Sequence, residues 1–510
     1  MHGLPKARSR RNGGEVVLGV CSVWNGRNGE DCAMRRTWYR HDQQAVVDAL
    51  RRGERPDMAT TMASGPLDEL VGLHEALGIF EILDGLPTTR RRRGIEDGLL
   101  LRTLATLPFV EQGSLSGAAG QLFGEPAILL HLGFSPLQIE IGDNERYRHP
   151  GGRKAESLPC HADTLRDALR RVENKVWLRA QQLGVKPLYQ RGLVRGRVYA
   201  IDGTGLGNDY RLVCLVCVSA ERPVIVAWRL LEGQASEKGK EAAVTRELIE
   251  QALALGGEDV MDLLLADALY ADGPLLAWLK YQKGIDVLVP IPADRDLHQD
   301  MMGLARGGLL KFRHHSYVRT VQGHKGRRKI EVAAQDGLTS WDSFVKAARG
   351  YGAEDPHLWA CLIHELEPRD LKSEWWTLAS TRPWPTPVVG FQSFRPRWHI
   401  ENDAYRELKE GWRLESQRWG RDPATQYGRI TLICLAFNTA QVYLSRSGAR
   451  AAAQGIRRLR RQYRPELGTA PVVIYIGPAY AVLPVEQLLV LLDASPRHSL
   501  LPFQIRPRAP

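Results

Sequence analysis

The sequence predicts an α/β fold built on a mixed β-sheet, with a β-rich insertion inside it and an all-helical region before it. Three observations support this prediction. Three consecutive β-rich segments follow one another with short connections from Gly196, which is typical of a meander. Two further apolar strands, ending near Asp267 and Pro292, alternate with helical patterns, as in a sheet with crossover helices. β-rich sequence then returns at Glu374 after a long irregular stretch.

The N-terminal third of the chain is expected to hold two different regions. Residues 1–57 are rich in Arg, Gly and Asn and have weak periodicity, so we expect a poorly ordered leader that makes few contacts with the core. Residues 58–190 have apolar residues at helical spacing and are predicted to form a helical domain. The arginine run Arg90–Arg93 within it favours a DNA-end-binding domain, with an ordinary helical bundle and a solvated charged face as the alternative.

The rest of the chain is divided by its change of pattern. Residues 191–293 alternate strands and helices and form the first part of the predicted core. Residues 294–374 are irregular and are expected to be an insertion, whose basic cluster comprises His324, Lys325, Arg327, Arg328 and Lys329. Residues 375–445 resume the core with a strand and two helices. Residues 446–510 form a basic C-terminal region with ten arginines and three acids, a charge of 10 − 3 = +7 that includes the cluster Arg457–Arg464.

The composition fits a globular protein of several domains. The chain has 510 residues, of which 44% are hydrophobic and 25% charged, which is ordinary for globular proteins and excludes disorder throughout. This length allows about two to four domains. The formal net charge of +11 favours a polyanionic partner, with nucleic acid as the default. A soluble enzyme that is merely basic is the alternative.

Cysteine use and hydropathy bear on the compartment. The seven cysteines are scattered and odd in number, so a reducing cytoplasm fits better than an oxidising one. Cys214 and Cys217 form a C-x-x-C pair inside an apolar strand pattern. Residues three apart on a strand face opposite ways, which disfavours a shared zinc ion. The best candidate for a membrane span, 472–492, is interrupted by glycine, prolines and a glutamate, so we expect a soluble protein.

Two aspartates stand where apolar strands end. Asp202 lies within the strand pattern VYAIDGTG, and Asp267 ends LLLAD. A charge inside an apolar strand is costly to bury unless it is paired or binds a cation. Because open sheets place ligand sites beyond the carboxyl ends of their strands, the two carboxylates are expected to converge. Oxygen ligands of this kind suit a hard cation such as Mg²⁺.

A third carboxylate comes from a helix expected to start near Pro396. Glu401 lies four residues after Arg397, so the two side chains share a helix face. Taken alone, the pair is an ordinary surface ion pair. Because this helix follows the returning strand EWWTLAST, Glu401 is also placed to complete a site for two metal ions. Such ions, about 4 Å apart, serve in-line displacement at phosphorus, and the sequence has no P-loop or G-x-S-x-G motif.

These motifs resemble those of the DDE transposases of bacterial insertion sequences, in particular the large cut-and-paste family numbered four. The resemblance covers roughly residues 67–444. The first acidic motif is matched by IDGT at 201–204 and the second by ADALYADG, with Asp267 and Tyr270. The tyrosine–arginine–glutamate–lysine signature is matched by Arg397 and Glu401, while Phe394 takes the tyrosine place.

The lysine of that signature is displaced by one residue. It is expected seven residues after the glutamate, where this chain has Leu408, and Lys409 follows one position later. On a regular α-helix seven residues turn by about 700°, whereas eight overshoot the starting face by roughly 80°. We therefore expect Lys409 to reach DNA less directly than a lysine at the usual spacing.

The resemblance implies a fold, a reaction and partners. It implies a ribonuclease-H-like catalytic core in which Asp202, Asp267 and Glu401 bind Mg²⁺ or Mn²⁺, as two ions. It implies cleavage at the ends of an element in double-stranded DNA, transfer of the freed 3′ ends to target DNA, and a dimer of protomers on DNA in the nucleoid. The residues then expected to contact DNA are Arg397, Lys409, Tyr270, Arg327, Arg328 and Lys329. Trp375 or Trp376 stacks on a distorted base in this interpretation and belongs to the core in the alternative.

Two other functions remain open on the sequence. A ribonuclease-H-like nuclease such as a junction resolvase uses the same carboxylates for hydrolysis alone, although the insertion and the helical N-terminal region argue against it. A DNA-binding relative whose catalysis has decayed is favoured by Phe394 and the displaced lysine and disfavoured by the intact acids.

Overall fold

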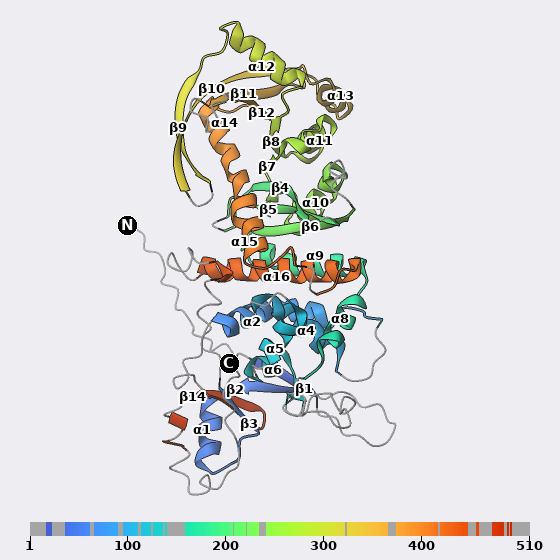
Figure 1. Ribbon diagram of the computed structural model, residues 1–510, viewed down its shortest axis with the longest axis vertical. Coiled ribbons are helices and arrows are strands. Elements are labelled where there is room, and N and C mark those ends of the chain that lie inside the picture. The colour runs from blue at the N-terminus through green and yellow to red at the C-terminus, as the bar shows by residue number, and fades with distance from the viewer. Residues whose placement is uncertain are drawn as a thin grey trace, which may run out of the picture. The chain divides into compact units, whose positions relative to one another are not determined.

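A computed structural model describes the greater part of the chain (Figure 1). The described ranges are 17–22, 36–61, 66–89, 95–110, 114–123, 126–135, 138–139, 159–207, 209–220, 222–233, 241–321, 324–365, 374–416, 419–446, 455–457, 472–483, 487–488 and 490–491. Arg90–Arg93 and all of the Arg457–Arg464 cluster except Arg457 lie outside them. The chain divides into two compact units, one formed by residues 73–82 and 172–456 and the other by the remaining segments.

The larger unit is built on one mixed sheet, which confirms the predicted fold class. The described residues form nine strands in the order β6-β5-β4-β7-β8-β12-β11-β10-β9. The strands are β4 (Val198–Leu206), β5 (Tyr210–Cys217), β6 (Val224–Glu232), β7 (Leu263–Ala266), β8 (Asp286–Ile291), β9 (Arg313–Val321), β10 (His324–Leu338), β11 (Leu358–Glu365) and β12 (Trp375–Ser380). The first three are the antiparallel meander expected from the sequence, while β4, β7 and β8 run parallel.

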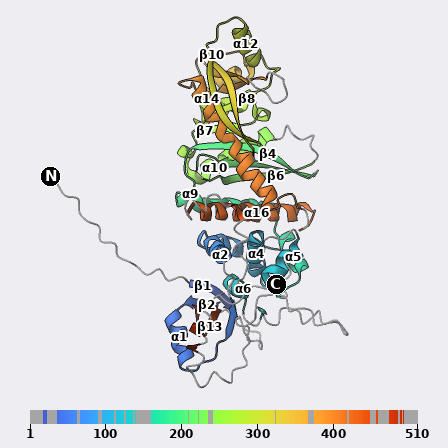
Figure 2. The same cartoon turned by 60° about the vertical axis from the view of Figure 1, so that its left-hand side comes forward.

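Local sequence explains the crossover helices. Asp272 caps the helix after β7 by accepting the Leu275 amide at 2.8 Å, and Pro274 occupies its first turn, as predicted. Helices α9 and α16 pack against each other and against β6 (Figure 2). The helices of this unit include α9 (Asn174–Gln190), α10 (Glu241–Gly256), α11 (Gly273–Ala277), α12 (Asp296–Arg306), α13 (Asp342–Gly350) and α16 (Pro423–Arg446), with a π-helical turn at Trp278–Gln282. Most of the short α3 (Ile79–Asp84) also belongs to this unit.

The segment predicted as an insertion extends the core sheet. β12 pairs with β8, and β11, β10 and β9 follow it outward. β10 pairs with β11 only from Ile330 onward, whereas its pairing with β9 begins at His324. The part of β10 before Ile330 therefore forms, with β9, a two-stranded projection that we call the ribbon, residues 316–321 and 324–329. It lies alongside the helix α14 (Pro387–Phe394) (Figure 1).

The smaller unit contains helices and a second sheet. Its helices are α1 (Gln43–Arg51), α4 (Asp97–Thr106), α5 (Leu115–Phe123), α6 (Pro126–Leu132) and α8 (Ala162–Arg170), with a 3-10 turn at Leu107–Phe109, and α2 (Pro66–Ala76) is divided between the two units. Its sheet has the order β1-β2-β14-β13-β3. The strands are β1 (Val17–Ser22), β2 (Arg36–His41), β3 (Met58–Thr61), β13 (Val472–Ile476) and β14 (Ala479–Leu483).

In the region 1–57 that was predicted as a loosely attached leader, the described residues 17–22 and 36–57 include β1, β2 and α1. Val46 and Leu50 of α1 are fully buried in one apolar cluster with Ile474 and Leu483. The residues that pack against α1 come from the other end of the chain, so the local sequence pattern could not predict them.

Within the described part of the chain, we find no helix with the length and apolar character that a membrane span needs.

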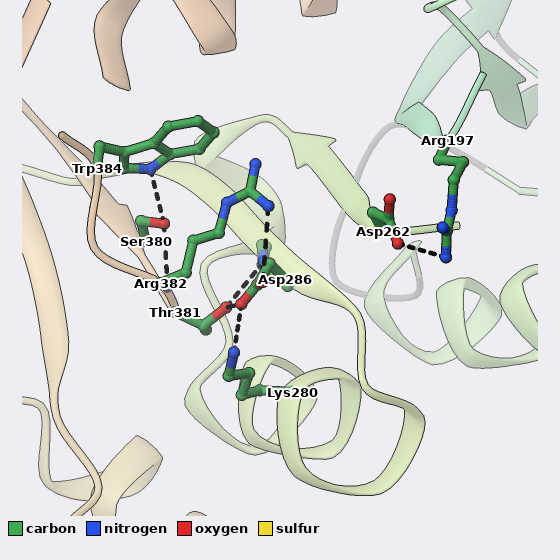
Figure 3. Close-up of polar contacts among 9 residues, drawn as sticks. Arg197, Asp262, Lys280, Asp286, Ser380, Thr381, Arg382 and Trp384 are labelled. Atoms are coloured by element: carbon green, nitrogen blue, oxygen red, sulfur yellow. Dashed lines mark hydrogen bonds and ion pairs between the residues drawn. The ribbon is translucent and has the colours of Figure 1, made fainter. Parts of the chain in front are cut away.

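A half-buried charge cluster lies at the start of β8 (Figure 3). The Asp286 carboxylate lies 2.7 Å from the Lys280 ammonium, accepts the Thr381 hydroxyl at 2.9 Å, and lies 3.9 Å from Arg382. The Arg382 guanidinium lies 4.2 Å from the centroid of the Trp384 ring. These residues join β8 to the end of β12, which is where the chain returns from its outer strands. The cluster therefore holds together the two halves of the core sheet.

We expect Asp286→Ala to lower the free energy of unfolding by about 2–3 kcal/mol, because it leaves the Lys280 ammonium and the Thr381 hydroxyl without their shared acceptor. The matched control is Asp262→Ala at the start of the neighbouring β7. Asp262 also pairs with a cation, Arg197 at 2.6 Å, but both side chains are about half exposed (Figure 3), so the control should cost under about 1 kcal/mol. Urea denaturation measures both values, and equal losses would contradict this role for Asp286.

Candidate active site

Asp202 is a buried carboxylate in the middle of the larger sheet. It lies on β4 between β5 and β7 and is only 8% exposed. The Gly203 amide donates to its Oδ1 at 2.8 Å. Burial raises the pKa of Asp202 to about 7, against the lowering effects of the Arg397 charge and the Gly203 amide. The ionised form of Asp202 at this buried position is therefore stabilised by a nearby positive charge.

The sheet register brings Asp267 to the same level. The last parallel pair between β4 and β7 is Ile201 with Ala266, so Asp202 and Asp267 are the next residues on adjacent strands. Asp267 ends its strand and accepts the Ala268 amide with its own side chain. Its negative charge, like that of Glu401, contributes to raising the pKa of Asp202. The two aspartates therefore stand at neighbouring positions on adjacent strands.

Arg397 links the third acid to the first. Its Nη2 lies 2.7 Å from Glu401 Oε1, and its Nη1 lies 3.8 Å from Asp202 Oδ2. The guanidinium is only 9% exposed, whereas Glu401 is 46% exposed. The predicted ion pair between Arg397 and Glu401 is therefore present, and its Arg397 side chain is buried while Glu401 is half exposed. The Nε and Nη1 atoms of this guanidinium have no hydrogen-bond partner within the described part of the chain.

The helix that carries these residues is irregular. It begins at Pro387, earlier than expected, with Thr386 accepting the Val389 amide at 3.2 Å. It then passes through a 3-10 turn at Arg395–Arg397, a π-helical turn η8 at Ile400–Tyr405, and the α-helix α15 at Arg406–Glu410. The 3-10 and π turns contact β4, so the helix crosses the sheet over this strand (Figure 2).

The π turn changes the expectation for Lys409. A π turn bonds residues i and i+5, and so holds one residue more than an α turn. The eight residues from Glu401 to Lys409, which pass through this turn, therefore rotate about the helix axis by nearly the same angle as seven residues of a regular α-helix. The predicted overshoot is therefore wrong, because it assumed a regular helix. Leu408 is fully buried, and Lys409 Nζ lies 2.7 Å from Glu415.

Tyr405 is a site residue that the sequence interpretation missed. Its hydroxyl donates to the main-chain carbonyl of Asp202 and accepts the Cys214 amide at 3.2 Å. The side chain is buried. The sequence shows a tyrosine four residues after Glu401. From the helical pattern alone, such a residue is interpreted as a packing residue.

The other predicted contacts separate into buried and exposed residues. Tyr270 is 1% exposed, so the predicted DNA contact is corrected: its side chain is buried at the end of the turn that follows Asp267. Arg327 and Lys329 are exposed on the ribbon, and Arg328 is half-buried. Phe394, in the tyrosine place of the signature, is buried.

The two tryptophans of β12 have aromatic neighbours within the protein. Trp375 stacks on His364 with ring centroids 4.0 Å apart and an interplanar angle of 3°. Trp376 lies 6.1 Å from Phe391 and 6.4 Å from Phe394 between ring centroids. Both are half-buried. These contacts favour the core interpretation over base stacking.

The donor set suits hard cations. In the described residues, no three His, Cys, Asp or Glu side chains lie close enough together to hold a single ion. A pair of ions does not require such a group, because Asp202 can be shared while Asp267 and Glu401 each serve one ion. The carboxylate oxygens are the ligands that Mg²⁺ and Mn²⁺ prefer. The chemical type of these ligands therefore suits a site for two such ions.

Comparison with known proteins identifies the same region. Residues 218–439, which are 222 of the 510 residues, match the family model described as "Transposase DDE domain". The match includes Asp267, Arg397 and Glu401 and begins after Asp202. No curated protein matches the chain significantly.

Proposed function

We propose that this chain, whose core is a transposase DDE domain, cuts DNA at the ends of an insertion sequence and joins the freed 3′ ends to target DNA. The observation that carries the proposal is the position of Asp202 and Asp267 on adjacent strands, with Glu401 tied to Asp202 through the buried Arg397. Three such acids can supply oxygen ligands to the pair of ions that phosphoryl transfer uses.

The three acids are the proposed metal ligands. Bound Mg²⁺ or Mn²⁺ would activate the attacking oxygen and stabilise the leaving oxygen of an in-line displacement. Asp202 is the shared ligand in this proposal because it stands between the other two acids in the network of charges. Its raised pKa means that proton loss from Asp202 accompanies cation binding near neutral pH.

Arg397 is proposed to position DNA. Two of its buried nitrogens have no hydrogen-bond partner among the described residues, and buried donors are normally satisfied. A phosphate oxygen beside the acids would satisfy them with charge-assisted hydrogen bonds. Lys409 is proposed as a second phosphate contact, reached by leaving its ion pair with Glu415.

The ribbon is proposed as a further DNA contact. Between Ser316 and Lys329 the sequence has five Lys and Arg residues and no acid. The ribbon is held beside the site because Arg395 donates to the Val318 carbonyl at 2.6 Å and its guanidinium lies 4.9 Å from the Tyr317 ring centroid. A two-stranded antiparallel ribbon has the width of the major groove.

Neutralising the ribbon should weaken DNA binding without changing sequence preference. For Arg327→Gln with Lys329→Gln, we expect the salt dependence of binding to flatten by about one unit of slope for each phosphate that is no longer neutralised. The control is Lys346→Gln, which removes a charge from α13, away from the ribbon. Binding titrations over a range of salt concentrations measure the slope. An unchanged slope in the double variant would assign these residues to a solvated surface.

The proposed function is tested on a supercoiled plasmid that carries two inverted element ends. We expect the protein to cut at the ends and to produce strand-transfer products in Mg²⁺ or Mn²⁺, as a dimer on two ends. Cutting without transfer would favour a resolvase-like nuclease. Binding without cutting in either metal would favour a relative whose catalysis has decayed. Assignment to the family numbered four in particular requires that the ends match its inverted repeats.

A further inference from the structure

The hydroxyl of Tyr405 joins the helix of Glu401 to the strand of Asp202. It donates to the Asp202 carbonyl and accepts the Cys214 amide at 3.2 Å. Asp202 and Cys214 face each other in the register of β4 and β5. One buried hydroxyl therefore holds the main chain of both strands at the level of the first acid.

The same tyrosine is tied to Glu401 through the π turn. Glu401 and Tyr405 lie in η8, and the amide of the next residue, Arg406, donates to the Glu401 carbonyl. The Glu401 carbonyl is thus held by the residue that follows Tyr405, and the Asp202 carbonyl is held by the Tyr405 hydroxyl. These two hydrogen bonds connect the main chain of one acid to that of the other without involving a charged side chain.

The hydroxyl can serve only in its neutral form. Tyr405 is fully buried, and burial raises its pKa well above the usual value, with further contributions from Cys214 and Asp202. Burial thus favours the neutral hydroxyl, which is the form that donates to the Asp202 carbonyl.

We propose that Tyr405 is a positioning residue that fixes the separation of the Asp202 and Glu401 carboxylates, and thereby the affinity of the site for divalent cations. The inference rests on the proposed function. Outer groups that orient metal ligands commonly change metal affinity or activity by about 10–100-fold when removed. Tyr405 acts through main-chain groups, so it touches neither cation nor DNA.

The test compares Tyr405→Phe with a matched control. Tyr427 on α16 also donates its hydroxyl to a strand carbonyl, that of Leu230 on β6, at 2.8 Å. Tyr427→Phe therefore removes the same kind of hydrogen bond away from the acids. Thermal unfolding of both variants measures the structural cost of the missing hydroxyl, which should be larger for Tyr405→Phe because this change also leaves the buried Cys214 amide without its acceptor.

Mn²⁺ titration of the full chain without DNA is the decisive measurement. We expect Tyr405→Phe to bind Mn²⁺ about tenfold more weakly than the parent, and Tyr427→Phe to bind it as the parent does. Cleavage by Tyr405→Phe should then recover in part at high Mn²⁺, which a loss of folding would not allow. Unchanged Mn²⁺ affinity in Tyr405→Phe would overturn the inference.

A crystal structure of each variant separates this inference from the proposed function. We expect the distance between the Asp202 and Glu401 carboxylates to change in Tyr405→Phe and to stay the same in Tyr427→Phe. A parent protein that binds no Mn²⁺ and cuts no DNA would refute the proposed function. An unchanged carboxylate distance in Tyr405→Phe would refute the positioning role, whatever the parent does with metal.

Discussion

Asp202→Asn, Asp267→Asn and Glu401→Gln are each expected to abolish end cleavage and strand transfer while leaving end binding intact. Each substitution keeps the shape of the side chain but removes the charge that a hard cation requires. The missing charge stabilisation amounts to several kcal/mol, which corresponds to a rate loss of at least about 1,000-fold. End binding persists because it depends on phosphate and base contacts elsewhere.

The plasmid assay with purified variants measures these losses. Asp262→Asn is the matched control, because Asp262 precedes β7 whereas Asp267 follows it. It changes a carboxylate to an amide at the opposite end of the same strand and should cut as the parent does. Cleavage by Glu401→Gln at the parental rate would show that the third acid is misplaced. The proposed mechanism would then fail.

Much of the core could be predicted from the sequence because its signals are local. The meander of β4, β5 and β6 is a run of strand-forming residues with short turns, and Asp272 with Pro274 marks a helix start within four residues. Asp202 stood out for the same reason, since a charge inside an apolar strand is costly. Such features depend on neighbours along the chain, which a single sequence displays.

The features that escaped prediction depend on contacts between distant segments. The sheet that joins α1 to β13 and β14 pairs opposite ends of the chain, so residues 1–57 looked like a leader. The burial of Tyr270 depends on what packs over the turn after Asp267. The role of Tyr405 depends on β4 and β5 lying beneath its helix.

The π turn at Ile400–Tyr405 is a different kind of omission. The spacing from Glu401 to Lys409 was converted into an angle with the geometry of a regular α-helix. The extra residue is absorbed within the turn that carries Glu401 and Tyr405. Single π turns are frequent at functional sites, and here the turn lets Tyr405 reach the Asp202 carbonyl. The residue spacing was therefore read with the wrong helical rotation.

Arg397→Ala is expected to reduce cleavage about 100-fold at neutral pH, less than the acid substitutions, because Arg397 positions groups and does not bind metal. Lys409→Ala should reduce cleavage less than Arg397→Ala does, since the Lys409 ammonium already forms an ion pair with Glu415. The Arg397 charge lowers the pKa of Asp202, which burial has raised to about 7. Its removal should raise that pKa further, so more Asp202 is protonated at pH 7 and cannot accept a cation.

The sign of the pH dependence follows from this shift. As pH rises above 7, Asp202 ionises in both proteins, so the deficit of Arg397→Ala should shrink toward the part caused by weaker phosphate binding. Cleavage rates from pH 6 to pH 9 measure the deficit, and Lys409→Ala serves as the control because Lys409 is not among the charges that shift the pKa of Asp202. A deficit that stays constant with pH in Arg397→Ala would mean that the guanidinium acts on DNA alone. A deficit that grows with pH would contradict the assigned coupling between Arg397 and Asp202.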